Sequence, residues 1–414
     1  MSVVALSALY ALLLWLVSSM LRGKGILLVA AGAAALAAAL VAAARGRRQP
    51  FYRLFFLTAL LAAGTLGAEG LLWLAPGLLK GRLANQVLSG YHSERDGIYV
   101  PDPYLGRTLR PGFARPMYWN GHVWRHEANA DGYRGPRLDR ADAVFLGDSM
   151  IYGHGVETAQ TVPARFQAIS GLASANLGQQ GTCPVHALEL LRRKGLRLHP
   201  RYVFVCAHPT DVMDAPTAYD RAELERFVEQ EGYRPLARTD AESAVFQYWL
   251  FHVAIPLRAA RVLRGVLHRS EPGAEPVVAA NDDARFVPSP EYVAQPFDPL
   301  APDADPAARL GWRALRRAIA EIQRESARIG ARVVVFDIGY PTAFSAAIEG
   351  LAREVGARYS DAGRTVLARA RRGEDLYLRR DGHWSPAGGD AVARGLAADL
   401  GQNDGTPSPS GVTE

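Results

Sequence analysis

Two short polar strings, far apart in the sequence, hold the residue types needed for nucleophilic catalysis. The string Gly-Asp-Ser at 147–149 directly follows an apolar run, and the string Asp-Gly-His at 381–383 precedes a helical pattern. A serine hydroxyl is a weak nucleophile near neutral pH, so it needs a histidine base, which an aspartate in turn orients. Together the strings predict a catalytic triad of Ser149, His383 and Asp381.

The serine string lies where a buried strand is expected to end. The apolar run 143–146 predicts a short strand, and Gly147 allows the backbone to turn sharply after it. Ser149 would then lie in a strand-to-helix turn at the carboxyl edge of a sheet, where open α/β folds bind ligands. A helix that begins nearby would direct N–H groups toward developing negative charge. An ordinary Gly-Asp-Ser turn is the alternative on this string alone.

The spacing of the histidine string suits a base and its orienting carboxylate. In an extended segment residues i and i+2 point to the same side, so Asp381 can hold Nδ1–H of His383 and leave Nε2 available to Ser149. Pro386 suits the first turn of the helix that follows. The alternative is a loop histidine beside a turn aspartate, and the serine string favours the triad over it.

Strands and helices are expected to alternate between the two strings. Apolar runs predict strands over 143–146, 173–177, 202–207 and 331–336, and helical patterns predict helices over 161–170, 184–198, 307–329 and 341–355. Such alternation predicts a three-layer α/β/α sandwich with a mostly parallel sheet. The triad residues would then lie at the carboxyl ends of strands or in loops that face them.

Four stretches of the chain resemble the sequence blocks of the SGNH/GDSL esterases and acyl hydrolases. The stretches are 144–149, 176–181, 205–211 and 381–383, and two upstream stretches, 102–106 and 129–135, are similar to a lead-in of bacterial members. The resemblance implies an SGNH-hydrolase-like fold that uses neither a metal nor a cofactor. It also implies an oxyanion hole formed by Ser149, Gly181 and Thr210, with supporting roles for Asp148, Asp211, His208 and Asn176.

The third block departs from the family at Thr210, where an asparagine normally supplies the third oxyanion donor. A threonine hydroxyl can donate, but it is shorter and its χ1 is stiff. Loss of one oxyanion donor typically costs about a hundred- to a thousandfold in rate, so the substitution bears on efficiency rather than on reaction class. His208 is an alternative donor, although a histidine at a strand end also has an ordinary structural interpretation.

The last block also departs from the family, because it reads Asp-x-His where Asp-x-x-His is commoner. Proteins of related fold that acetylate envelope glycans also use an Asp-x-His-Trp string, which matches 381–384 here. Trp384 and Trp119 are candidates for a sugar site, with a core or rim position as the alternative for each.

Three apolar stretches in the first 80 residues are long enough to cross a bilayer. Residues 1–21 and 25–44 carry no charge, and 54–79 carries only Glu69, which would lie near the interface or, at mid-depth, mark a functional position. The arginine-rich loop 45–53 is expected to stay cytoplasmic. Three spans would place the large domain on the periplasmic side of a bacterial inner membrane, and two would leave it in the cytoplasm.

The composition is consistent with a globular enzyme attached to a lipid bilayer. The 414 residues carry a formal net charge of +6, with no dense basic stripe that would indicate a nucleic-acid partner and no Cys/His spacing typical of zinc sites. Two cysteines, Cys183 and Cys206, follow or end adjacent predicted strands. They could form a disulfide in an oxidising compartment or serve as small buried residues.

The predicted organisation has four parts: a membrane anchor at 1–80, a lead-in segment at 81–140, a hydrolase domain at 141–401 with an insertion at 212–305, and a disordered tail at 402–414. Within the insertion, residues 241–268 could form a cap over the site, lie on a membrane surface, or pack on the body as an ordinary helix.

These observations predict a membrane-anchored serine esterase that acts on O-acyl groups, acetyl above all, of envelope or secreted glycans. Two alternatives stay open. The same triad could transfer the acyl group to a sugar hydroxyl, which would make the protein an O-acyltransferase. The domain could also be a non-catalytic glycan-binding or assembly module, an interpretation that Thr210 keeps open.

Overall fold

A computed structural model describes residues 99–119, 122–238, 286–289, 304–379 and 381–401, with isolated positions between 41 and 71. The chain divides into two compact units, Met1–Tyr91 with Glu242–Glu271, and His92–Ala241 with Pro272–Glu414. The described helices and strands named below all belong to the second unit. Most of the predicted anchor, residues 241–268 of the insertion and the tail 402–414 lie outside the described residues.

Among the residues that the structure describes, no helix combines the length and the apolar character that a membrane span requires.

A five-stranded parallel sheet forms the centre of the second unit. Its strands are β5 (Ala143–Leu146), β6 (Ser174–Asn176), β7 (Tyr202–Ala207), β8 (Arg332–Asp337) and β9 (Arg358–Ser360). They lie in the order β6-β5-β7-β8-β9, and every neighbouring pair is parallel. The strand that leads to the serine string therefore lies inside the sheet, between β6 and β7.

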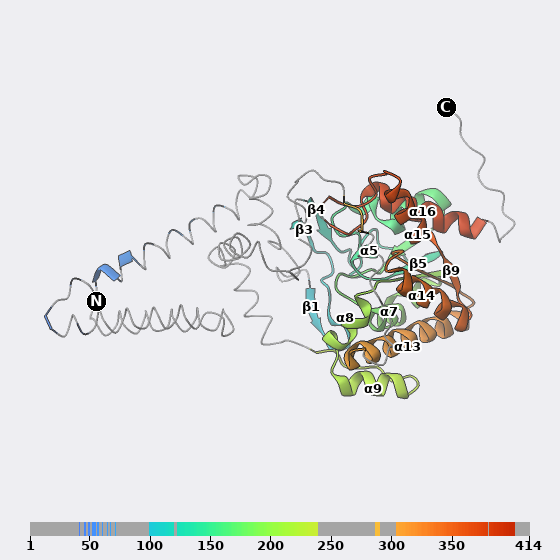
Figure 1. The fold of residues 1–414 in the computed structure, drawn as a ribbon, viewed down its shortest axis with the longest axis horizontal. Coiled ribbons are helices and arrows are strands. Elements are labelled where there is room, and N and C mark those ends of the chain that lie inside the picture. Colours follow the sequence, from blue (N-terminus) through green and yellow to red (C-terminus); the bar gives the residue numbers. More distant parts are fainter. Residues whose placement is uncertain are drawn as a thin grey trace, which may run out of the picture. The chain divides into compact units, whose positions relative to one another are not determined.

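Helices cover both faces of this sheet, as the three-layer prediction requires. Alternate residues of β5 belong to different cores: Val144 and Leu146 pack on one face, and Ala143 and Phe145 on the other. The first core includes α7 (Pro184–Leu190), α8 (Asp211–Ala218), α9 (Arg221–Glu229), α13 (Pro306–Arg328) and α14 (Thr342–Glu354). The second includes α6 (Val162–Ser170), α15 (Ala362–Arg371) and α16 (Pro386–Gly401). In Figure 1, α13 and α16 lie on opposite sides of the sheet.

Two antiparallel hairpins precede the sheet and were not predicted from the sequence. The strand β1 (Tyr99–Asp102) pairs with β2 (Gly106–Leu109), and β3 (Ala114–Trp119) pairs with β4 (His122–Glu127). Both hairpins lie in the segment 81–140 that was expected to lead into the catalytic domain.

The predicted elements of the sheet region agree closely with the observed ones, with one difference in α7. The predicted helix 184–198 is α-helical only over Pro184–Leu190 and continues as a π turn, η4 (Leu191–Gly195), and a 3-10 turn, η5 (Leu196–Leu198). Gly195 lies against Leu191, Val144 and Leu177, so this bend brings the chain close to the sheet.

Candidate active site

The nucleophile string lies at the carboxyl end of β5, as the sequence predicts. Ser149 is the first residue of the short helix α5 (Ser149–Tyr152), and Asp148 caps that helix by accepting a 2.9 Å hydrogen bond from the backbone N–H of Met150. Gly147 has room for no side chain, since a Cβ there would lie 2.7 Å from Ile151 and 3.1 Å from Cys206. The tight turn therefore holds Ser149 at the edge of the sheet.

His383 contacts this serine, and Asp381 contacts His383. Nε2 of His383 lies 2.7 Å from Oγ of Ser149, across 234 residues of sequence. Nδ1 of His383 hydrogen-bonds to Oδ1 of Asp381. These contacts bring Ser149, His383 and Asp381 together in the order that a nucleophile, a base and an orienting carboxylate would require.

The expectation that 381–383 is extended was wrong in its backbone geometry. Residues 381–383 form a bend, in which Oδ1 of Asp381 also accepts a 3.0 Å hydrogen bond from the backbone N–H of His383. One carboxylate oxygen thus binds both the backbone and the ring of the same histidine, which fixes the imidazole more firmly than side-by-side positions on a strand would.

The pKa values of this pair follow from their contact. Burial alone would raise the pKa of the Asp381 carboxyl, but the His383 imidazole beside it holds that pKa below its usual value. Burial lowers the pKa of His383, yet the attraction of Asp381, helped by Asp148, raises it above the ordinary value. The ion pair formed when His383 takes a proton is therefore favoured.

The second block approaches α5 from β6. Asn176 is buried; its Nδ2 donates a 2.9 Å hydrogen bond to the Ile151 carbonyl, and its Oδ1 accepts a 3.0 Å hydrogen bond from the N–H of Gly178. A Cβ on Gly178 would lie 2.3 Å from the Tyr152 nitrogen, so this contact requires glycine. Asn176 thus holds the helix α5 and the second block together.

Gly181, the expected oxyanion glycine, has a left-handed φ of 63°. A Cβ at this position would lie 2.9 Å from Nη2 of Arg107, and that same nitrogen donates a 3.3 Å hydrogen bond to the Gln180 carbonyl. The loop at Gly181 is therefore held from outside by β2.

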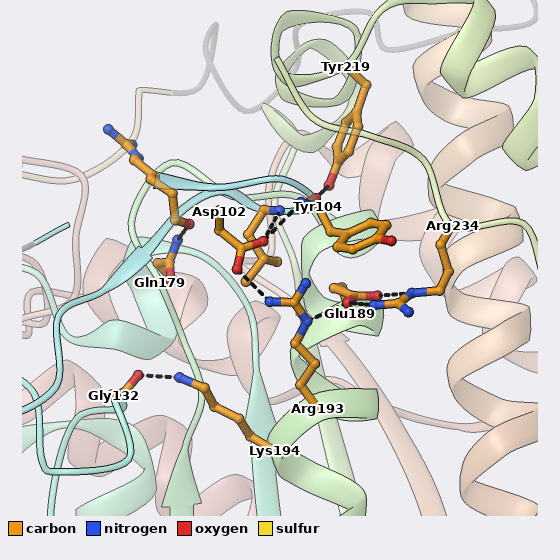
Figure 2. A network of polar contacts seen from close by, with 11 residues as sticks. Asp102, Tyr104, Gly132, Gln179, Glu189, Arg193, Lys194, Tyr219 and Arg234 are labelled. Carbon is orange, nitrogen blue, oxygen red and sulfur yellow. Dashed lines mark hydrogen bonds and ion pairs between the residues drawn. The ribbon is translucent and has the colours of Figure 1, made fainter. Parts of the chain in front are cut away.

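A network of polar contacts fastens the first hairpin to the helix that follows this loop (Figure 2). Arg193 donates a 2.5 Å hydrogen bond to Asp102 and another of 2.5 Å to Glu189, and Tyr219 donates a 2.9 Å hydrogen bond to the Tyr104 carbonyl. Nε2 of Gln179, within the second block, donates a 2.9 Å hydrogen bond to the Arg107 carbonyl. The expected lead-in thus supports the oxyanion block rather than merely preceding it.

The third block places Thr210 and His208 in contact with each other. Oγ1 of Thr210 lies 2.8 Å from Nδ1 of His208, and the Thr210 N–H donates a 3.2 Å hydrogen bond to the same nitrogen. Asp211 accepts a 2.8 Å hydrogen bond from the His208 N–H, and Asp148 approaches Nδ1 of His208 to 4.0 Å. Burial lowers the pKa of His208, against the pull of Asp148. His208 is therefore neutral near pH 7, with Nδ1 as an acceptor.

A small pocket of about 230 Å³ of empty space opens beside Ser149 and His383. The lining residues are Ser149, Met150, Gly153, His154, Val156, Gln160, Thr161, Val162, His383, Trp384, Ser385 and Gly389. Trp384 is 4% exposed and belongs to the core, whereas the side chain of Trp119 lies outside the described residues.

Within the described residues, one cluster has ligand atoms close enough to hold a metal ion: His154, Asp381 and His383, whose candidate atoms lie within 4.8 Å of one another. Two of its members, Asp381 and His383, are already joined by a hydrogen bond. Cys183 and Cys206 are both buried free thiols, and burial raises the pKa of each, which leaves neither as a nucleophile.

Sequence reasoning missed Arg134, a buried residue that organises the chain after the nucleophile. Its guanidinium donates to the carbonyls of Tyr152, Gly153, Val156 and Arg125, at 2.6 to 3.1 Å, and to Oγ1 of Thr158 at 3.2 Å. The lead-in string 129–135 contains this arginine, but the string also carries Asn129 and Asp131, so nothing in it marks the arginine as buried.

Comparisons with known proteins found one family match and several similar solved structures. Residues 342–411 match the family described as "SGNH hydrolase-like domain, acetyltransferase AlgX". No curated protein matches the chain.

Three solved structures illustrate the similarity. A GDSL-like lipase from Bacteroides thetaiotaomicron is 12% identical, with 64% of this chain and 88% of that chain covered and a TM-score of 0.32. A catalytic mutant of an acetylxylan esterase from Geobacillus stearothermophilus is 11% identical, with 64% and 96% covered and a TM-score of 0.34. An alpha/beta hydrolase enzyme from the metagenome of Lake Arreo, Spain, is 12% identical, with 64% and 97% covered and a TM-score of 0.34.

The family match covers the C-terminal part of the domain, including the base and its orienter, and the predicted nucleophile block lies against them. The chain is therefore similar, over residues 342–411, to the SGNH hydrolase-like domain family.

Proposed function

We propose that this protein is a serine esterase that removes O-acyl groups, acetyl above all, from envelope or secreted glycans. The observation that carries the proposal is the 2.7 Å contact between Nε2 of His383 and Oγ of Ser149, with Asp381 bound to the other ring nitrogen. The small pocket beside Ser149 supports a short acyl group, because it offers little room for a long chain.

In the proposed reaction, Oγ of Ser149 attacks the ester carbonyl carbon while Nε2 of His383 takes the hydroxyl proton. The tetrahedral intermediate collapses when the bond to the leaving alcohol breaks and His383 returns that proton to the alcohol oxygen. Water then attacks the acyl-enzyme and gives its proton to His383, which passes it back to Oγ as the free acid leaves. Asp381 stabilises the imidazolium at both stages.

The oxyanion would be held by the N–H groups of Ser149 and Gly181 and by the pair Thr210 and His208. The Thr210 hydroxyl lies against Nδ1 of His208, which favours a proton on Nε2 of His208. The pair can therefore supply the third donor, from the hydroxyl or from the ring, in place of the family's asparagine.

The test is p-nitrophenyl acetate hydrolysis by the full chain and by its Ser149→Ala variant. We expect nitrophenol release by the unmodified chain, and a fall to near background in the variant, a loss of at least about a thousandfold. Mass spectrometry after a brief acid quench should show one acetyl group on the peptide that contains Ser149. Equal release from both chains, with no acetylated peptide, would refute the esterase proposal.

An O-acyltransferase is a second candidate, and the description of the matching family as an acetyltransferase favours it. Both reactions share the acyl-enzyme and differ only in whether water or a sugar hydroxyl attacks it. Adding glycan oligosaccharides to the acetylated enzyme distinguishes them: a transferase yields acetylated oligosaccharide, and an esterase yields free acetate. A non-catalytic glycan-binding module has less support, since it would not need a hydrogen-bonded Ser149–His383–Asp381 set.

We also propose that the first 80 residues anchor the enzyme in a bacterial inner membrane, with the catalytic domain on the periplasmic side. The apolar stretches 1–21, 25–44 and 54–79 support this placement. A second support is that six of the nine exposed large apolar side chains of the described residues fall between positions 41 and 71. These six are Val41, Tyr52, Phe56, Leu57, Leu60 and Leu71.

A further inference from the structure

A second histidine lies directly against the catalytic one. The rings of His154 and His383 are stacked, with centroids 4.5 Å apart and an angle of 28° between their planes. His154 is buried, with 7% of its surface exposed, and follows the nucleophile helix by two residues. Its backbone N–H donates a 3.0 Å hydrogen bond to the Ser149 carbonyl, so the residue is tied to the nucleophile as well.

Neighbours from three other parts of the chain fix the His154 ring. Trp124 of β4 packs on it at a centroid distance of 4.6 Å. Nδ1 of His154 lies 2.5 Å from Nε2 of Gln180, and Oε1 of Gln180 accepts a 3.3 Å hydrogen bond from the Tyr99 hydroxyl. Because Gln180 thus presents its amide N–H to His154, Nδ1 of His154 is the acceptor, and neutral His154 carries its proton on Nε2.

The same ring lies beside the orienting carboxylate. A nitrogen of His154 lies within 4.8 Å of a carboxylate oxygen of Asp381 and of a ring nitrogen of His383. Nδ1 is bound to Gln180, so the proton of the neutral His154 ring is on Nε2. His154 also favours the charged form of Asp381, whose pKa is lowered chiefly by His383 against the effect of burial.

We propose that His154 is a positioning residue of the catalytic site, which holds the His383 imidazole flat by stacking and directs an N–H group at Asp381. The role rests on the proposed function, because it acts through the base of the same triad. Through Gln180, the residue before the expected oxyanion glycine Gly181, His154 also links the base to the oxyanion block. Neither role follows from the family blocks, because His154 lies between them.

Two variants of His154 test the contribution of the stacked ring and the contribution of the donated N–H separately. His154→Phe keeps an aromatic face against His383 and removes the N–H group. His154→Gln places an amide N–H near the position of Nε2 and removes the stacked ring. His199→Asn is the matched control, because His199 is exposed and its φ of 50° suits asparagine.

The charged and titratable groups that face His383 are Asp381, Asp148, His208 and His154. An N–H directed at Asp381 withdraws part of the negative charge that attracts a proton to His383. We therefore expect His154→Phe to raise the pKa of His383 by about 0.5 to 1, and His154→Gln to leave it nearly unchanged. Both variants should lower kcat by about tenfold with little change in KM, since neither alters uniform substrate binding.

The pKa of His383 is measured in the full chain by NMR titration of labelled histidine Cε1–H resonances, assigned with a His383→Gln variant. This readout needs no turnover, so it decides the role of His154 even if the unmodified chain hydrolyses no ester and the proposed function fails. An unchanged His383 titration in His154→Phe would overturn the proposal, whether or not the unmodified chain hydrolyses the ester. So would activity losses that only follow a loss of folded protein while the titration of His383 stays constant.

Discussion

At the scale of single residues, the site depends on a histidine whose proton affinity its neighbours have increased. Asp381 raises the pKa of His383 above 6.5, although burial works in the opposite direction. The base acts in its neutral form, so activity is gained as the pH rises through this pKa and lost below it.

We therefore expect kcat/KM for p-nitrophenyl acetate to fall on the acid side with an apparent pKa above 6.5. Asp381→Asn removes the attraction for the imidazolium, so the acid limb should move to lower pH while kcat drops by about 10⁴. Rates measured between about pH 5 and about pH 9 test both statements. An acid limb that stays in place in the asparagine variant would mean that another group titrates.

At the scale of elements, one contact between backbones decides where the nucleophile lies. Gly178 after β6 touches the main chain of α5, and a Cβ there would lie 2.3 Å from the Tyr152 nitrogen. Gly363 of α15 makes a comparable contact remote from Ser149, with a Cβ 1.8 Å from the Asp337 carbonyl at the end of β8.

The substitutions Gly178→Ala and Gly363→Ala should distinguish an effect on the position of α5 from an effect on the stability of the fold. Each adds one methyl group to a filled contact and should destabilise the fold by about 1–3 kcal/mol. Only Gly178→Ala should move α5, and a displacement near 1 Å can cost up to about a hundredfold in rate. Urea unfolding gives the stabilities, and kcat per folded molecule gives the effect on the site. Equal kcat for the two folded variants would contradict the positional role of Gly178.

Arg134 joins the hairpin β3–β4 to the loop after α5. Arg134→Met removes the donor for four carbonyls, three of them in buried hydrogen bonds, which should cost about 3 kcal/mol in the free energy of unfolding. Arg125→Met is the control, because its side chain is 64% exposed and should contribute within about 0.5 kcal/mol. Chemical denaturation compares the two, and similar losses would contradict a special role for Arg134.

The sequence predicted the strands that form a clear apolar run. It did not predict strands that lack such a run. The runs that became β5, β7 and β8 are almost wholly apolar because both faces of the sheet are covered. The strand β9 has only three residues, Arg358–Ser360, and no apolar run to mark it. The hairpins β1–β2 and β3–β4 were not predicted, because polar and charged residues are frequent in strands such as β2 and β4.

The triad could be predicted because each string carries chemistry in a short stretch next to a recognisable element. The stacking of His154 on His383 could not, since it depends on how the loop after α5 folds back over a residue more than 200 positions away. The same limit applies to Thr210 and His208: the sequence named both as donors, and only the fold brings the Thr210 hydroxyl against the His208 ring.

At the scale of the whole molecule, the proposed anchor would confine the site to the membrane surface. We expect the full chain to remain in the membrane fraction after alkaline carbonate extraction, since three apolar spans would hold it by burial in the bilayer. Protease added to spheroplasts should then digest the catalytic domain but not a cytoplasmic control protein. Release by carbonate would contradict the anchor, and protection from protease would contradict the periplasmic placement.

The separation of 234 positions between Ser149 and His383 also sets the order in which the parts become available during translation. The ribosome makes the nucleophile first and the base near the end, at roughly 5–20 residues per second, so Ser149 waits roughly 10 to 50 seconds for its partner. Throughout that time the serine is an ordinary hydroxyl, unable to react with the esters around it. The proposed activity would thus begin only when the domain is complete.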